Sequence, residues 1–338
     1  MLHSVFPHDT DVVSALRYCL SVVGRLLAKP MVVSGDPKGV MAAVNFIVGR
    51  SKFVSGVLSF AESKVSLKVL RQIIKEHLVV LFPGVDPREV AYTYILHRDK
   101  GRVELHYIIA KVHLLTGKRL GGYLHRIDRK RLRLWIQTVN DRFGFADPND
   151  PCRWRLYSPA NRNSPKSRLE KQTLLLEGLG RMAMAGAVRN RADIERELVK
   201  AGWQISRRTK SAISVTAVGL KYPVRLSGAM FSAAWNGILS AERIAELSER
   251  FHRERIERFE RTVDALTPHI QRRALHNSMR FGKRGLKNAA ALLSRLKSPK
   301  WRQTMEVRGP QEVLTVGLRL AEAPAERAAV VLNPTMRF

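Results

Sequence analysis

The chain has 338 residues, of which 59 are Lys or Arg and 29 are Asp or Glu, giving a formal net charge of +30. An excess of this size indicates a polyanionic partner. Nucleic acid is favoured over a membrane, because the sequence shows no apolar span and no secretory signal. The 2 cysteines, Cys19 and Cys152, exclude a disulfide scaffold and a cysteine-based zinc module, and they fit a reducing cytosol.

The first half of the chain alternates between helical and β-rich segments. Apolar residues at helical spacing predict helices over residues 11–29, 37–48, 64–81 and 128–143. A strand is expected over 53–60, and two β-rich runs flank Lys100-Gly101, a two-residue loop typical of a hairpin. Helices interleaved with a mostly antiparallel sheet predict an α+β fold in which a central antiparallel sheet has flanking helices.

The second half begins after a stretch rich in Pro and Asn, which places a linker near 150–165. We expect three regions: a metal-dependent DNA-nicking domain over 1–157, a DNA-binding unit over 166–236, and a basic, mostly helical region with a tail over 237–338. In the middle region a helix over 191–200 and β-rich runs at 211–218 and 222–226 favour either a winged-helix-like unit or plain α+β packing. In the last region, 241–266 is typical of a surface or bundling helix, and 269–302 of a helix pair that tracks phosphates.

The hairpin gathers side chains that bind metals. Folding its strands about the turn places His97 opposite Glu104, and side-chain alternation brings Asp99 and His106 to the same face. Two imidazoles and a carboxylate suit several divalent metals and leave coordination positions for a substrate. The geometry alone leaves two interpretations open, a solvated strand face and a metal site.

Further segments accompany the hairpin in a characteristic order. An early tyrosine, Tyr18, is followed by Ser55-Gly56-Val57 within 51–62 and by the hairpin itself, and the set continues with Leu115–Lys118, Trp135–Asn140 and Gly144–Pro148. This order resembles the plasmid mobilization relaxases of the MobA/MobP type, in particular the colicin-plasmid branch with its His-Glu-Asn metal triad. The resemblance covers roughly the first half of the chain and continues more weakly to about residue 235.

The resemblance implies an enzyme that nicks one DNA strand at an origin of transfer, stays attached to the 5′ end through a phosphotyrosine, and later rejoins the strand. It places Tyr18 at the nucleophile, and His97 and Glu104 at the first two triad positions. His106 stands where this branch has Asn, although other relaxase branches use His there. The implied cofactor is a divalent metal ion, Mg²⁺ or Mn²⁺.

Three more residues receive roles by the same resemblance. Ser55 corresponds to the motif that holds DNA near the nick, and Lys118 is assigned a DNA contact. Asp99 matches an acidic position, where it could accept the phenolic proton of Tyr18 or orient His97.

The resemblance also implies partners. These are the origin of transfer, single-stranded at the nick site, mobilization accessory proteins, and the coupling protein of a conjugative transfer system. The expected location is the bacterial cytoplasm, from which the protein is transferred with the DNA strand.

Other functions remain open at this point. A rolling-circle replication initiator would use similar chemistry, and a non-enzymatic DNA-binding accessory protein would have a purely structural hairpin. His97, Asp99 and His106 could also form the two-His-one-carboxylate site of a non-haem iron oxygenase, although the charge and the early tyrosine argue against it. Tyr18 by itself, on a helix, is more typical of a core or interface residue.

Overall fold

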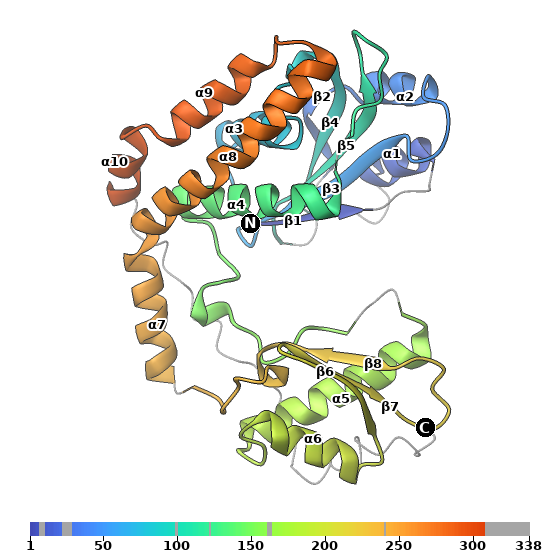
Figure 1. Cartoon of the computed structure of the whole chain (residues 1–338), viewed down its shortest axis with the longest axis vertical. Helices are drawn as coiled ribbons and strands as arrows, with labels where there is room; N and C mark the ends of the chain where they lie inside the picture. Colours follow the sequence, from blue (N-terminus) through green and yellow to red (C-terminus); the bar gives the residue numbers. More distant parts are fainter. Residues whose placement is uncertain are drawn as a thin grey trace. The chain divides into compact units, whose positions relative to one another are not determined.

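The computed structural model describes residues 1–6, 11–21, 29–98, 101–121, 123–160, 164–239 and 241–307. The chain forms two compact units, which are coloured along the sequence in Figure 1. The first unit combines Met1–Asp147 with the helices from His252 onward, and the second spans Pro148–Phe251. The roles expected for 1–157, 166–236 and 237–338 stay predictions, but helices of the third region belong to the same compact unit as the first.

The described residues of the first unit contain a five-stranded antiparallel sheet in the order β1-β3-β5-β4-β2. Its strands are β1 (Leu2–Phe6), β2 (Met31–Gly35), β3 (Phe53–Ser59), β4 (Val90–His97) and β5 (Glu104–His113). The two strands of the expected hairpin therefore lie at the centre of the sheet, with β3 and β2 outside them. The α+β fold with a central antiparallel sheet is confirmed.

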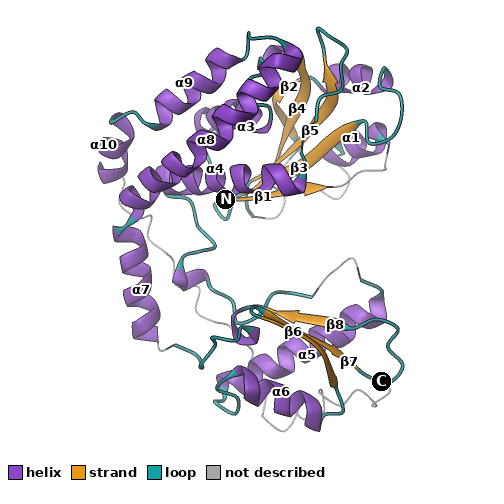
Figure 2. Cartoon of the chain, viewed as in Figure 1, coloured by secondary structure: helices purple, strands orange, loops and turns teal. Residues whose placement is uncertain are grey.

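Helices cover both faces of this sheet, as Figure 2 shows by colour. One face carries α1 (Val12–Leu20) and α2 (Pro37–Asn45), which begin at the N-caps Asp11 and Asp36 and pack on Ile95 and Ile108. The other face carries α3 (Leu67–Leu81), α4 (His125–Phe143), α8 (Arg255–Phe281) and α9 (Leu286–Leu296), followed by α10 (Lys300–Val307). The sheet is thus the middle layer of a three-layer unit.

Helix α8 is integral to the larger hydrophobic core. Its apolar stripe, including Phe259, Leu266 and Ile270, is buried against the layer that contains α3 and α4. An ion pair fixes the register of the two helices, with the Arg258 Nη2 2.7 Å from Asp141 Oδ1. Although the sequence separates α8 from α4 by more than a hundred residues, its contacts make it part of the sheet unit.

The Ser55-Gly56-Val57 segment requires glycine at its centre. A Cβ atom at position 56 would lie 2.3 Å from the hydroxyl oxygen of Tyr107 and 2.2 Å from the carbonyl oxygen of Ser4. The missing side chain lets the Tyr107 ring lie across β3, where its hydroxyl is 2.8 Å from His3 Nε2. Gly56 therefore supports the core face of the sheet, while its neighbours face the other side.

Acidification is expected to destabilise the first unit through His3. Burial lowers the pKa of His3 to about 4, so between pH 6.5 and 4 the unfolded chain binds a proton that the folded chain does not. The contribution of neutral His3 to the free energy of unfolding is complete above pH 6.5. It decreases by about 2–3 kcal/mol as the pH falls toward 4. His3→Gln, which does not titrate, should lose less stability than wild type in urea unfolding between about pH 7 and about pH 4.5. Equal losses in the two proteins would contradict this.

The second unit contains α5 (Lys166–Met184), α6 (Arg191–Lys200), α7 (Ala241–Arg253) and a three-stranded antiparallel sheet in the order β6-β7-β8. The strands are β6 (Gln204–Thr209), β7 (Ala212–Thr216) and β8 (Val224–Ser227). The helix over 191–200 and two of the strands were expected, whereas β6 was not. The winged-helix interpretation stays a prediction. In the part of the chain that the structure describes, no helix is long and apolar enough to cross a bilayer.

Candidate metal centre

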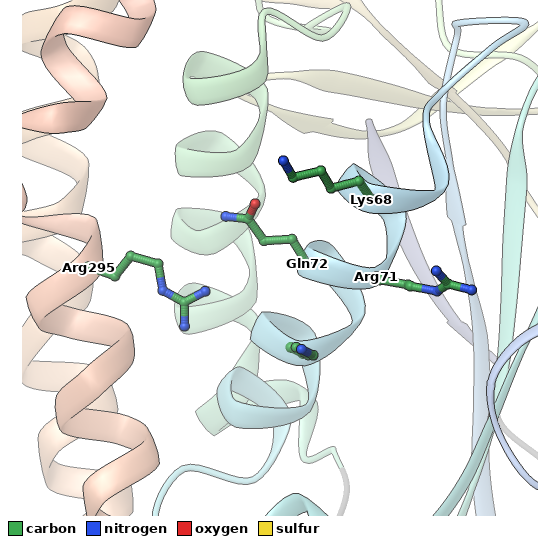
Figure 3. Close-up of a pocket in the computed structure, with 5 residues that line it drawn as sticks. Lys68, Arg71, Gln72 and Arg295 are labelled. Atoms are coloured by element: carbon green, nitrogen blue, oxygen red, sulfur yellow. The ribbon is translucent and has the colours of Figure 1, made fainter.

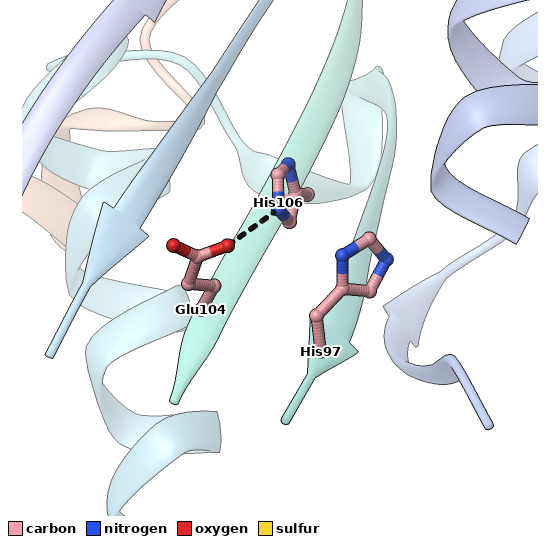
Figure 4. A group of neighbouring side chains, drawn as sticks. All are labelled: His97, Glu104 and His106. Carbon is pink, nitrogen blue, oxygen red and sulfur yellow. Dashed lines mark ion pairs between the residues drawn. The ribbon is translucent and has the colours of Figure 1, made fainter. Parts of the chain in front are cut away.

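The two central strands bring three metal-binding side chains together. His97 on β4 pairs directly with Glu104 on β5, as the hairpin register predicts, and His106 follows two residues later on the same face. Their exposed fractions are only 2%, 5% and 6%. Ligand atoms of the three residues all lie within 4.8 Å of one another, and Figure 4 shows the side chains converging above the strands.

The two imidazoles are oriented by specific contacts. Their ring centroids are 4.2 Å apart, and His106 Nε2 lies 3.6 Å from Glu104 Oε2. On the other side of the cluster, His97 Nε2 is 2.7 Å from the carbonyl oxygen of Cys19. A carbonyl only accepts, so His97 donates from Nε2, and Nδ1 is then the ring nitrogen that could bind a metal. Histidines that bind metals commonly donate their second ring nitrogen in this way.

Arg102 also contacts the cluster and was not anticipated. Its Nε lies 3.0 Å and its Nη2 2.5 Å from Glu104 Oε1, so the guanidinium contacts one carboxylate oxygen while the other faces His106. The spacing of two residues along an extended chain could have suggested this pair. Two imidazoles and one buried carboxylate are a ligand set that could hold a divalent cation, with His97, Glu104 and His106 as the residues that would hold it.

Tyr18 lies beside this cluster on α1. Val12, Leu16 and Cys19 of that helix are buried, whereas the Tyr18 side chain is 57% exposed. The Tyr18 ring meets the edge of the His106 ring at a centroid distance of 6.0 Å. The hydrogen bond from His97 to Cys19 ties the end of α1 to the metal-binding strand. An exposed phenol is therefore held next to three metal-binding side chains, and Tyr18 is not a core residue.

Comparisons with known proteins identify plasmid proteins of similar sequence. The chain is 30% identical over 226 residues to the DNA relaxase MbeA of Escherichia coli, a match that covers 67% of this chain and 44% of that protein. It is also 30% identical over 168 residues to the cryptic plasmid protein C of Neisseria gonorrhoeae, covering 50% of this chain and 82% of that protein. The chain belongs to the plasmid mobilization relaxases. No family model and no solved structure matches it.

The remaining residues with predicted roles in this mobilization relaxase lie at different distances from the cluster. Ser55 is buried on β3 opposite Ile108, on the sheet face that also carries His106. Lys118 follows the far end of β5, where its Nζ is 3.4 Å from the carbonyl oxygen of Arg280. That end is about 23 Å along the strand from His106, so Lys118 does not join the metal cluster. Asp99 lies outside the described residues, and the roles of all three stay predictions.

Proposed function

We propose that this chain nicks one DNA strand at a plasmid origin of transfer and rejoins it after mobilization. The observation that carries the proposal is the exposed phenol of Tyr18 beside His106, in a chain that belongs to the mobilization relaxases. The matched region spans less than half of MbeA, so the activity is inferred from this site together with the family. The branch with the His-Glu-Asn triad remains a prediction, because position 106 is histidine.

In the proposed reaction, the Tyr18 hydroxyl oxygen attacks the phosphorus of the scissile phosphodiester. The new bond joins the tyrosine to the 5′ phosphate, the bond to the 3′ oxygen breaks, and that oxygen takes up a proton to leave as a 3′ hydroxyl. The phenolic proton passes to a base, for which Asp99 is our proposal from the sequence. Because the phosphotyrosine keeps the phosphodiester linkage, the 3′ hydroxyl can reverse the reaction and restore the strand.

His97, Glu104 and His106 would bind the divalent ion near the attacked phosphate. The chemistry that such an ion supplies when bound is polarisation of the non-bridging phosphate oxygens. Arg102 holds one oxygen of Glu104, which leaves the other directed toward His106. Ser55, on β3 beside β5, would contact the DNA near the nick.

The proposed partners follow from this reaction. They are the origin of transfer, accessory proteins that expose it as a single strand, and a coupling protein that passes the attached strand to a conjugative apparatus. We further propose that the protein acts in the bacterial cytoplasm and leaves it covalently attached to the transferred strand.

The decisive experiment uses supercoiled plasmid that carries the chain's own mobilization region. With Mg²⁺ or Mn²⁺, followed by detergent and protease, we expect open circular DNA with a single nick and protein attached to its 5′ end. Removal of divalent metal with EDTA should stop nicking and leave DNA binding in place, because phosphate contacts supply most of the affinity. A plasmid without the mobilization region is the control. Unchanged nicking by metal-free protein would exclude the metal role.

A further inference from the structure

A basic hollow lies on the face of the sheet opposite the metal cluster. It has a volume of about 400 Å³ and is lined by Lys68, Arg71, Gln72 and Lys75 of α3 and by Arg295 of α9. Figure 3 shows Lys68, Gln72 and Arg295 directed into the space between the two helices, with Arg71 extending on the other side of α3. Helix α3 packs on the core face of the sheet, whereas His97 and His106 occupy the face of α1 and α2.

The charge of this hollow is not balanced by nearby acids. Within the described residues, Lys68, Arg71 and Lys75 form no ion pair. The carboxylate beneath the hollow is Glu76, whose side chain is fully buried and pairs with the equally buried Arg142 at 2.6 Å. Arg295 reaches the same carboxylate only at 3.9 Å. Because this acid is already neutralised by a buried arginine, the exposed cations Lys68 and Lys75 on the α3 wall of the hollow are left without an acidic partner among the described residues.

The spacing of these cations suits a run of phosphates. Lys68 and Lys75 are seven residues apart, which corresponds to about 10 Å along a helix. Phosphates of one strand are spaced by roughly 3.4 Å along the axis of a duplex and lie farther apart in an extended single strand, so about two of them match this length. The volume is within the range of small-molecule sites and could accommodate part of one strand. Arg295 extends from α9 toward the α3 wall that carries Lys68 and Gln72.

We propose that this basic hollow binds the phosphates of single-stranded DNA, as a second strand-binding site separate from the metal cluster. The choice of DNA over another polyanion rests on the proposed function. The site would hold the strand without reading its sequence, because the lining offers cations to phosphates and a single amide, Gln72, to anything else. It would keep hold of DNA away from the nick while the strand is cut and rejoined.

The test measures binding of the full chain to labelled oligo-dT by fluorescence anisotropy in EDTA, between roughly 50 and 200 mM salt. The variant carries Lys68→Gln, Lys75→Gln and Arg295→Gln. The matched control carries Lys29→Gln, Lys38→Gln and Lys130→Gln, which remove the same charge from exposed lysines outside the hollow and outside the segments expected to bind DNA. The salt slope is the slope of the logarithm of the binding constant against the logarithm of the salt concentration. We expect its magnitude to fall by about 2 in the hollow variant, and the affinity at 100 mM salt to fall on the order of 10- to 100-fold. Arg295→Lys, which keeps the charge, should bind as wild type does.

Each outcome bears on the inference. Equal losses in the hollow variant and the control would mean a general effect of net charge and would overturn it. An unchanged oligo-dT slope, with lost binding to duplex DNA or to phosphatidylserine vesicles, would assign the hollow to those ligands instead. Thermal unfolding must match wild type, as expected for exposed side chains. Binding is measured without metal, and cleavage is not measured. A chain that fails to nick DNA can therefore still be tested for this binding site, and loss of the binding site would not contradict the nicking reaction.

Discussion

Tyr18→Phe is expected to abolish the covalent protein–DNA adduct and leave the protein folded and able to bind DNA. The substitution removes only the hydroxyl group, whose oxygen is the nucleophile of the proposed reaction. Since the side chain is 57% exposed, the free energy of unfolding should change by less than about 1 kcal/mol. A denaturing gel with labelled origin DNA measures the adduct, and urea unfolding measures the stability.

Tyr222→Phe provides the matched control for this variant. Tyr222 is 59% exposed, almost the same as Tyr18, and belongs to the second unit. The Tyr222→Phe variant should form the covalent protein–DNA adduct at the wild-type level. Adduct formation by Tyr18→Phe at that level would assign the nucleophile to another residue.

Alanine at His97, Glu104 or His106 is expected to weaken binding of divalent metal and to lower nicking by at least ~100-fold, because each substitution removes a ligand atom. Origin DNA should still bind, since its affinity comes from phosphate contacts distributed over the chain. Calorimetric titration with Mn²⁺ measures the metal, and plasmid nicking measures the reaction. His276→Ala, an exposed histidine on α8, is the control.

His106→Asn tests whether the metal site needs an imidazole at position 106 or only some ligand atom there. Asparagine offers an oxygen in place of the imidazole nitrogen, so nicking should persist with a shift toward metals that prefer oxygen. Retention of both Mn²⁺ affinity and nicking by His106→Ala would remove this residue from the metal site.

The centre of the first unit could be predicted because its pattern is local. The hairpin strands are adjacent in the sequence, and alternation of side chains fixes which residues share a face once the turn is known. The pairing of His97 with Glu104 and the position of His106 therefore follow from the sequence and are present in the structure. The family resemblance added Tyr18, which no local pattern connects to the hairpin.

Other features of the site depend on contacts that the sequence does not encode locally. The carbonyl group of Cys19 orients His97, and a backbone acceptor leaves no signature in residue type. In the second unit, β6 carries several polar and basic residues in an exposed strand, so it lacked the apolar alternation that identified its neighbours.

The C-terminal helices show a similar limit. Helical periodicity identified an apolar stripe from 241 onward, but it could not say which surface that stripe would cover. The structure divides this stretch at Glu254 into α7 and α8, and α8 buries Phe259 and Leu266 in the core of the sheet unit. A fragment that ends near the expected linker would keep Tyr18 and the metal-binding residues but expose the surface that α8 covers.

The discontinuity of the first unit has a consequence for its synthesis on the ribosome. A nascent chain emerges from its N-terminus, so the strands and metal-binding residues appear long before α8 and α9. The intervening Pro148–Phe251 unit has a hydrophobic core of its own and is fully synthesised in that interval, while the sheet unit waits for its last helices with part of its core exposed. A translation product terminated early would therefore lack a finished sheet unit, and the complete core would form only in chains translated at least through α9.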